Sequence, residues 1–150
     1  MFNKISEIAD LKNLEVIANK LAKLVSLGDV IFLCGELGSG KTTFARYFIK
    51  EIFINHSISN KAKIIRSPTF NIMINYPLKD FQIFHYDLYR IKHINEIHEL
   101  DIYENVRNNI TLIEWPEIIF KNSTIKKYYK IDFKIESINK RKIDIVLNDT

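Results

Sequence analysis

The sequence contains one cluster of residues whose types and spacing suit phosphate binding. Residues 35–42 read Gly-Glu-Leu-Gly-Ser-Gly-Lys-Thr, which matches the phosphate-loop pattern G-x-x-x-x-G-K-S/T. Glycines permit backbone angles that are closed to other residues, so successive N–H groups can turn inward around phosphate oxygens. Three of the four glycines of the chain fall within this loop. The sequence therefore predicts a nucleotide-binding loop.

The side chains of this loop suggest how a nucleotide would be held. Lys41 is expected to reach the outer phosphates and to stabilise charge in the transition state, and the Thr42 hydroxyl is expected to bind Mg²⁺. Thr43 lies one residue further into the following helix, so it can offer its N–H or hydroxyl to the inner phosphate. The other loop residues expected to contact the nucleotide are Gly35, Gly38, Ser39 and Gly40.

Two carboxylates are candidates for the chemistry beside this loop. Mg²⁺ prefers oxygen ligands, so it needs a carboxylate besides Thr42 and the phosphates. Glu114 ends the apolar run 110–113, and Asp87 ends the more polar segment 81–86. Both would lie at strand ends, where ligands bind in open α/β sheets. We expect Glu114 to bind the metal and Asp87 to orient or deprotonate the attacking water, with the reverse assignment as the alternative.

The hydrophobic pattern predicts the elements that position these residues. An apolar run at 30–34 indicates a buried strand before the loop, and helical periodicity over 41–54 indicates the helix after it. The other expected elements are a helix at 11–25 capped by Asp10, strands at 70–76 and 81–86, a helix at 94–106, a strand at 110–113, a short helix beginning at Pro116, and a C-terminal hairpin of strands 129–135 and 142–147. This order predicts an α/β fold of the P-loop NTPase class: one domain over residues 1–150, with a mixed central sheet, helices on both faces and a C-terminal β-hairpin.

Composition excludes several other classes of protein. The 150 residues are 47% hydrophobic and 27% charged, which is typical of a folded globular domain and argues against a disordered or fibrous chain. No apolar run reaches the roughly 18 residues needed to cross a bilayer, so no membrane association is expected. The lone Cys34 agrees with a reducing compartment, and a cytoplasmic location is expected. The net charge of +4 does not decide whether nucleic acid is bound.

Four motifs in one order resemble the TsaE family, the bacterial ATPase of tRNA threonylcarbamoyladenosine biosynthesis. They are the phosphate loop, Ser-Pro-Thr-Phe at 67–70, His-Tyr-Asp-Leu-Tyr-Arg at 85–90 and Ile-Glu-Trp-Pro-Glu at 113–117. The resemblance covers about residues 28–117. It implies a small P-loop ATPase that uses ATP and Mg²⁺ and does not modify tRNA itself. Such a protein supports the two-protein threonylcarbamoyl transferase that modifies the adenosine beside the anticodon.

The same resemblance implies partners and residue roles. The partners are the two transferase subunits, a kinase-like subunit and its inactive paralogue, and tRNA is reached through their complex. Thr42 and Glu114 would hold Mg²⁺, and Asp87 would belong to the hydrolytic centre. Thr69 would sit in a switch-like loop that senses the nucleotide, and Trp115 would lie beside the site. From the residues alone, Thr69 could instead cap the next strand and Trp115 could pack against the sheet.

Polar residues near these motifs allow more than one interpretation. His85 could hydrogen-bond Asp87 or the backbone, or could be structural. Arg90 could neutralise charge on the transferred phosphoryl group, contact tRNA or a partner, or form an exposed salt bridge. The basic run 140–142 is expected to be the solvated turn of a hairpin, with tRNA contact as the alternative.

Two other functions are compatible with a phosphate loop. A small-molecule P-loop kinase uses the same lysine, hydroxyl and carboxylate set, but needs an arginine-rich lid, and only Arg107 follows Arg90 before the last central strand. A non-hydrolysing ATP-dependent adaptor would use ATP only to order the Thr69 loop into a docking surface. Slow hydrolysis that rises with a protein partner would distinguish the expected ATPase from a kinase.

Overall fold

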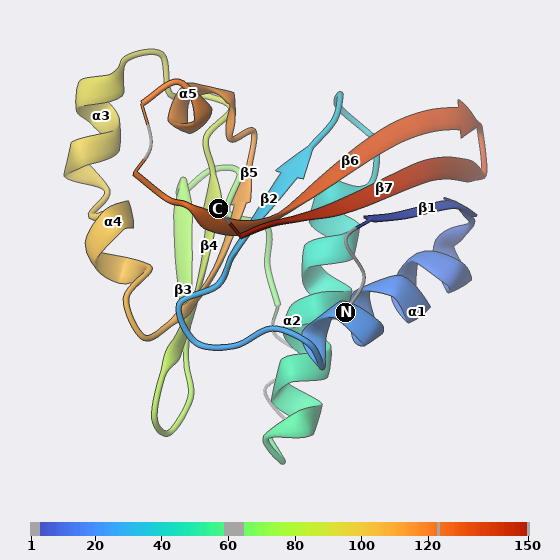
Figure 1. Ribbon diagram of the computed structural model, residues 1–150, viewed down its shortest axis with the longest axis horizontal. Helices are drawn as coiled ribbons and strands as arrows, with labels where there is room; N and C mark the ends of the chain where they lie inside the picture. The colour runs from blue at the N-terminus through green and yellow to red at the C-terminus, as the bar shows by residue number, and fades with distance from the viewer. Residues whose placement is uncertain (1–3, 59–64, 123, 150) are drawn as a thin grey trace.

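The computed structural model describes residues 4–58, 65–122 and 124–149 (Figure 1). Its strands are β1 (Lys4–Ala9), β2 (Val30–Cys34), β3 (Met73–Pro77), β4 (Gln82–Asp87), β5 (Ile110–Glu114), β6 (Lys127–Ser137) and β7 (Lys140–Asp149). Its helices are α1 (Leu11–Ala22), α2 (Lys41–Asn55), α3 (Ile94–Glu99), α4 (Ile102–Asn105) and α5 (Glu117–Phe120). The strands form one sheet in the order β1-β7-β6-β2-β5-β4-β3.

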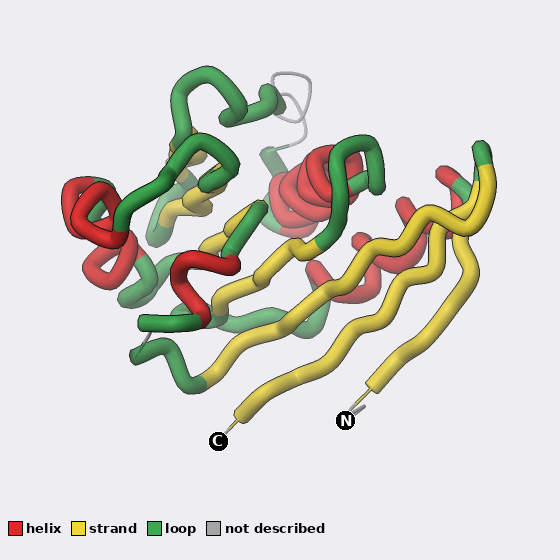
Figure 2. Tube along the Cα trace, turned by 90° about the horizontal axis from the view of Figure 1, so that it is seen from above, coloured by secondary structure: helices red, strands yellow, loops and turns green. Residues whose placement is uncertain are grey.

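The centre of the sheet is parallel and its edges are antiparallel. Strands β6, β2, β5 and β4 run in one direction, whereas β7 pairs with β6, β3 with β4, and β1 with β7 in the antiparallel sense. Every residue of β2 and β5 is buried, which explains why β2 is an unbroken apolar run and β5 is apolar except for Thr111 and Glu114. Figure 2 shows β6, β7 and β1 side by side, with β1 beginning and β7 ending at the same end of the sheet. The predicted mixed sheet and C-terminal hairpin are confirmed.

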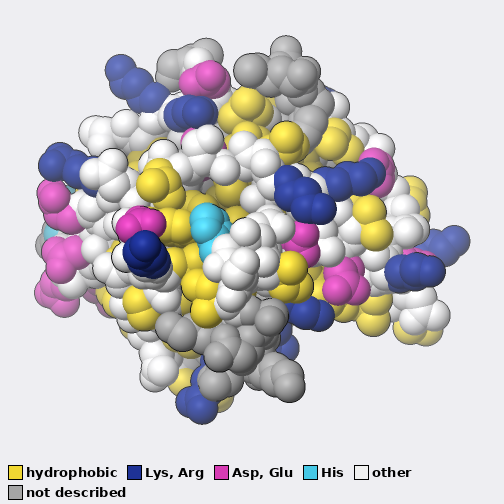
Figure 3. All heavy atoms as spheres, turned by 90° about the horizontal axis from the view of Figure 1, so that it is seen from below, with side chains coloured by type: hydrophobic (Ala, Val, Ile, Leu, Met, Phe, Trp, Pro, Cys, Tyr) yellow, Lys and Arg dark blue, Asp and Glu magenta, His cyan; other side chains and the backbone are white. Residues whose placement is uncertain are grey.

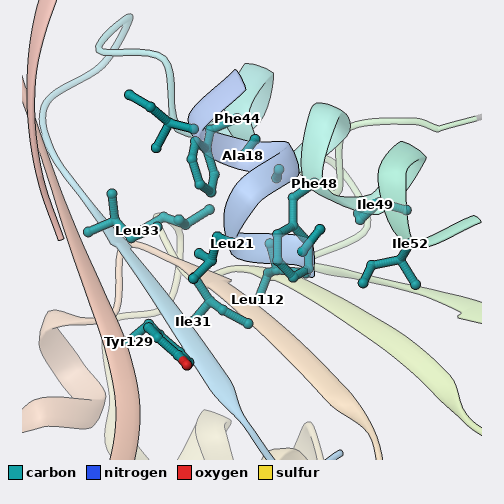
Figure 4. Close-up of a cluster of buried hydrophobic side chains, with 14 of the residues drawn as sticks. Ala18, Leu21, Ile31, Leu33, Phe44, Phe48, Ile49, Ile52, Leu112 and Tyr129 are labelled. Atoms are coloured by element: carbon teal, nitrogen blue, oxygen red, sulfur yellow. The ribbon is translucent and has the colours of Figure 1, made fainter. Parts of the chain in front are cut away.

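Helices cover both faces of this sheet (Figure 1). Helices α1 and α2 pack over one face, where side chains such as Phe44, Phe48 and Ile49 meet Ile31 and Leu112 of the central strands (Figure 4). Helices α3, α4 and α5 cover the other face. Among the helices of the described ranges, none has the length and apolarity needed to cross a bilayer. The prediction of helices on both faces is therefore confirmed.

The single helix predicted over 94–106 is wrong, because the chain forms two short helices separated near Asp101. Asp101 adopts a left-handed conformation with φ 52°, which aspartate tolerates better than most residues. Ile97 of α3 and Ile102 of α4 are both fully buried in the same core. In one continuous helix these side chains would point roughly 140° apart around the axis. The break lets both of them enter the core.

Other differences concern element boundaries and the first strand. Strand β3 begins at Met73, and Phe70, the predicted start, is 82% exposed. Helix α1 ends at Ala22, earlier than predicted, while Asp10 caps it as expected by accepting a hydrogen bond from the Asn13 N–H at 2.8 Å. Strand β1 is not predicted from the sequence, because its residues do not alternate between polar and apolar; the strand forms by pairing with β7.

Two isoleucines of α2 provide a matched test of this packing. Ile49 is fully buried, whereas Ile54 is 45% exposed. We expect Ile49→Ala to lower the free energy of unfolding by about 3 kcal/mol, because it removes buried methyl groups and leaves a cavity. Ile54→Ala should change it by less than about 0.5 kcal/mol. Urea unfolding followed by circular dichroism measures both, and equal losses would contradict the described orientation of α2.

Candidate functional site

Residues 35–40 connect the C-terminal end of β2 to the start of α2, so the phosphate-loop motif has the strand and helix that it requires. Gly35 has φ 152°, and a Cβ atom there would lie 2.6 Å from Ser39 Oγ and 2.7 Å from the carbonyl oxygen of Phe133 in β6. Such distances leave no space for a side chain. The close approach of the loop to β6 therefore requires glycine at this position.

Arg141 of β7 fixes the outer side of the loop. Its guanidinium donates to the carbonyl oxygens of Ser39 at 3.2 Å and Gly38 at 3.1 Å, and also to Ser137 in the β6–β7 hairpin at 2.8 Å. The prediction that 140–142 form only a solvated turn is thus wrong for Arg141. Because β6 pairs with β2, the hairpin extends past the end of β2 and brings Arg141 to the loop. No local sequence signal could have identified this contact.

Lys41 is held inside the loop by its ammonium group. The side chain is only 5% exposed, and Nζ donates to the carbonyl oxygens of Gly35 at 2.7 Å and Glu36 at 2.9 Å. Nζ also lies 4.1 Å from the ring centre of Trp115, a cation–π distance. Burial lowers the pKa of Lys41, against the opposing effect of the Glu114 carboxylate. The two carbonyls and the ring thus hold the ammonium group in place. Phosphate oxygens could accept from it instead of the carbonyls, because hydrogen bonds between charged groups are stronger.

Glu114 ends β5 and is 2% exposed. The Thr42 hydroxyl lies 2.9 and 3.0 Å from its two carboxylate oxygens, and His85 Nε2 lies 2.8 Å from Oε1. The structure thus joins the two residues predicted to hold Mg²⁺. It also gives His85 a partner that the sequence analysis did not consider, since the contact depends on the register between β4 and β5.

Asp87 ends β4 directly beside Glu114, with which it is paired in register. Its carboxylate accepts from the Tyr89 N–H at 3.0 Å and from the Thr69 hydroxyl at 3.3 Å. Thr69 is exposed, and its hydroxyl also lies 2.6 Å from that of Ser67. The loop that precedes β3 therefore meets the site at Asp87, while Glu114 faces the phosphate-loop helix.

These groups surround a cavity of about 230 Å³. Its walls are Leu37, Gly38, Gly40, Lys41, Thr42, Thr43, Thr69, Asp87, Tyr89, Glu114 and Trp115. The structure thus gathers nearly all of the predicted site residues around one space. Gly35 and Ser39 are not among its lining residues. The Gly35 carbonyl oxygen accepts from Lys41. The Ser39 side chain is buried, and its Oγ has no hydrogen-bond partner in the described part of the chain.

Trp115 and Arg90 have contacts that the sequence left open. Trp115 is half-buried, lines the cavity and packs against the Tyr89 ring at 4.8 Å between ring centres. Arg90 is exposed and lies 5.3 Å from the ring centre of Phe70. Trp115 is therefore a wall of the cavity, whereas Arg90 is not among its lining residues and packs against Phe70.

A second cavity, of about 400 Å³, opens on the other side of the loop. It shares Gly38, Gly40 and Thr43 with the first. Its further walls come from the start of α1 and from the β6–β7 hairpin, and they are Ala9, Asp10, Leu11, Lys12, Leu14, Ile138, Asn139 and Arg141. The sequence gives no signal that these residues share a cavity, because they come from segments more than a hundred positions apart.

Comparison with known proteins identifies the family to which this chain belongs. The family model described as threonylcarbamoyl adenosine biosynthesis protein TsaE matches residues 8–143 of this chain. The chain belongs to the TsaE family. The tRNA threonylcarbamoyladenosine biosynthesis protein TsaE of Rickettsia felis is 39% identical over 142 residues, which cover 92% of this chain and 79% of the relative. The protein of the same name from Bacillus subtilis is 34% identical over 105 residues, covering 70% of this chain and 61% of the relative.

The fold is also found among solved structures. The crystal structure of Bacillus subtilis YdiB aligns with a TM-score of 0.70 and 24% identity, and the alignment covers 100% of this chain and 88% of that one. The TsaE family match covers residues 8–143 and so extends beyond the resemblance recognised in the sequence, which covers about residues 28–117. It therefore includes Asp10 and Arg141, the residues from opposite ends of the chain that meet at the second cavity.

Two glycines of the loop separate steric crowding from backbone strain. Gly38 has φ 73°, and within the described ranges a Cβ atom there would meet nothing within 4 Å beyond its chain neighbours, so Gly38→Ala should cost only the conformational penalty of about 1 kcal/mol. Gly35→Ala adds a clash with the Phe133 backbone, and we expect a loss of at least about 2 kcal/mol. Chemical unfolding measures both losses. A smaller loss for Gly35→Ala than for Gly38→Ala would show that the loop does not pack against β6 as described.

Proposed function

We propose that this chain is a Mg²⁺-dependent ATPase that acts as a nucleotide switch in tRNA threonylcarbamoyladenosine biosynthesis. The observation that carries the proposal is the contact of the Thr42 hydroxyl with the Glu114 carboxylate at 2.9 Å, in the cavity that also contains Lys41. A hydroxyl from the loop helix and a carboxylate from an adjacent strand are the protein ligands that P-loop NTPases offer to Mg²⁺. The names of the family and of its curated relatives support the pathway.

The donor set fits Mg²⁺ in its chemistry. Thr42 and Glu114 present oxygen atoms from two elements to one cavity, and Mg²⁺ takes oxygen ligands from one or two side chains together with phosphates and water. When bound, Mg²⁺ would neutralise charge on the phosphate oxygens. We assign Thr42 and Glu114 to this role.

In the proposed complex, different parts of the nucleotide occupy the two cavities. We place the phosphates of ATP in the 230 Å³ cavity beside Lys41, and the sugar and base in the 400 Å³ cavity. The second cavity has apolar walls such as Leu11 and Ile138 for the faces of a base, and polar groups such as Asn139 for its edge. Thr43 lines both cavities, in agreement with the predicted contact to the inner phosphate.

Asp87 is the residue that we assign to the attacking water. Both oxygens of Glu114 lie within hydrogen-bond distance of the Thr42 hydroxyl, whereas Asp87 is bound only by groups of the surrounding loops. In the proposed step the water oxygen bonds to the γ-phosphorus and Asp87 takes its proton. The bond from the γ-phosphorus to the bridging oxygen breaks, and its electron pair leaves with ADP. Lys41 stabilises the charge that develops on the phosphoryl oxygens.

Thr69 supplies the proposed switch. Its exposed loop contacts Asp87 through the Thr69 hydroxyl at 3.3 Å, a distance typical of a weak hydrogen bond. A γ-phosphate in the first cavity would offer the hydroxyl a charged acceptor instead. The position of this loop would therefore differ between the ATP and ADP states, as in other nucleotide switches.

The proposed partners are the two threonylcarbamoyl transferase subunits, the kinase-like subunit and its inactive paralogue, with tRNA reached through their complex. Exposed apolar side chains from three loops, Leu37, Phe70 and Ile138, are available for a protein partner. On the face drawn in Figure 3, basic side chains lie at separate places with acidic ones among them, rather than in the continuous basic field that direct nucleic-acid binding uses. On this face the charge distribution thus favours a protein partner over direct contact with tRNA.

The function is tested by ATP turnover of the purified protein with and without Mg²⁺, alone and with the two transferase subunits and tRNA. We expect slow Mg²⁺-dependent turnover that rises strongly with the partners. Lys41→Ala should lower turnover by at least about 100-fold, because one donor to the transition state is lost. Phosphate appearing on a small metabolite would favour a kinase, and ATP-dependent assembly without phosphate release would favour an adaptor.

The roles of the two acids are separated by substitution. Glu114→Ala should abolish the effect of Mg²⁺ on ATP binding, whereas Asp87→Ala should leave it within about twofold and reduce turnover by about 100-fold or more. Calorimetric titration of ATP at several Mg²⁺ concentrations measures the first effect, and phosphate release measures the second. If Asp87→Ala loses the Mg²⁺ effect and Glu114→Ala keeps it, the two assignments are reversed.

A further inference from the structure

His85 lies beneath the candidate site and is completely buried. Its Nε2 is 2.8 Å from Glu114 Oε1, and its Nδ1 has no hydrogen-bond partner within the described ranges. His85 precedes Asp87 by two residues, so both side chains point to the same face of β4. Neither cavity of the site is lined by His85. The ring therefore reaches the site through Glu114 alone.

The two hydrogen-bond partners of Glu114 differ in how firmly they can hold its carboxylate. The Thr42 hydroxyl lies within 3.0 Å of both oxygens and can rotate about its C–O bond. The imidazole contacts Oε1 only, and burial on all sides fixes the direction in which its Nε2 points. A carboxylate oxygen only accepts, so this hydrogen bond requires the proton on Nε2. The ring therefore determines which oxygen stays against the core and which is turned toward the cavity. Without this donor, Oε1 would be a buried acceptor held by Thr42 alone.

We propose that His85 is a positioning residue, which orients the Glu114 carboxylate for the Mg²⁺ of bound ATP and so raises the affinity of the nucleotide complex for Mg²⁺. The inference rests on the proposed function, because it takes Glu114 as a Mg²⁺ ligand. His85 contacts neither the nucleotide nor the ion. Hydrogen-bond partners behind a metal ligand fix its orientation, and their removal commonly lowers metal affinity by about 10- to 100-fold.

Two amide substitutions distinguish this role from simple filling of the core. The amide nitrogen of glutamine reaches the position of Nε2, whereas that of asparagine, which is shorter by one methylene, lies nearer to Nδ1. We expect His85→Asn to raise the Mg²⁺ concentration for half-maximal binding of a fluorescent ATP analogue by about 10-fold, and His85→Gln to stay within about threefold of the unsubstituted chain. In EDTA, all three proteins should bind the analogue equally. Equal shifts for both variants, or none for His85→Asn, would overturn the proposal.

The effect must act through Glu114. In a Glu114→Ala background, His85→Asn should cause no further change in Mg²⁺ dependence, because the group that it orients is missing. A further change there would overturn the proposal. If the unsubstituted chain shows no Mg²⁺ effect on binding, the proposed function itself fails. If the unsubstituted chain shows the effect and His85→Asn leaves it intact, only the present inference fails.

A measurement on the unsubstituted chain keeps the test decisive if His85→Asn does not fold. Nitrogen-15 NMR of the imidazole should show the proton on Nε2 in the ATP complex, and the Nε2 signal should move when Mg²⁺ is added. The same addition should leave the signal unchanged in Glu114→Ala. A proton on Nδ1, or an Nε2 signal that does not respond to Mg²⁺, would contradict the positioning role.

Discussion

The register of the three parallel strands β2, β5 and β4 controls the positions of nearly all groups in the candidate site. It pairs Leu33 with Glu114 and Glu114 with Asp87, so both acids stand at one edge of the sheet, directly beside the loop that follows β2. A shift of one residue would turn a whole set of side chains to the opposite face. Glu114 would then point where Ile113 now lies, in the core under α3, α4 and α5. The apolar residues of both faces thus hold the carboxylates in place.

Within this frame Lys41 and Glu114 are paired with groups of the protein itself. Lys41 donates to two loop carbonyls, Glu114 accepts from Thr42, and Nε2 of His85 lies 2.8 Å from Glu114 Oε1. Buried charges without partners would be costly, so these contacts make the site compatible with a stable fold. Two carboxylates and one lysine line the 230 Å³ cavity, and a nucleotide would add further negative charge. A divalent cation bound together with the nucleotide would balance that charge, as we propose for Mg²⁺.

The sequence predicts those parts of the site that are local in the chain. Sequence patterns over a few residues predict the loop motif, the buried strand before it and the helix after it. The contact of His85 with Glu114 could not be predicted, because it depends on the register of β4 and β5. The contact of Arg141 with the loop could not be predicted either. The break at Asp101 was missed for a similar reason: tertiary packing of Ile97 and Ile102 overrides the helical periodicity between them.

The phosphate loop, although its motif is short, depends on both ends of the described chain. Strand β1 pairs with β7, β7 carries Arg141, and Asp10 follows β1 at the wall of the second cavity. Opening of these outer strands would remove Arg141 from the loop carbonyls. A nucleotide that binds only the closed loop would in turn stabilise the outer strands by linkage. If the chain binds a nucleotide as we propose, that binding would therefore be coupled to the folding of the hairpin, although the hairpin contains no residue of the phosphate-loop motif.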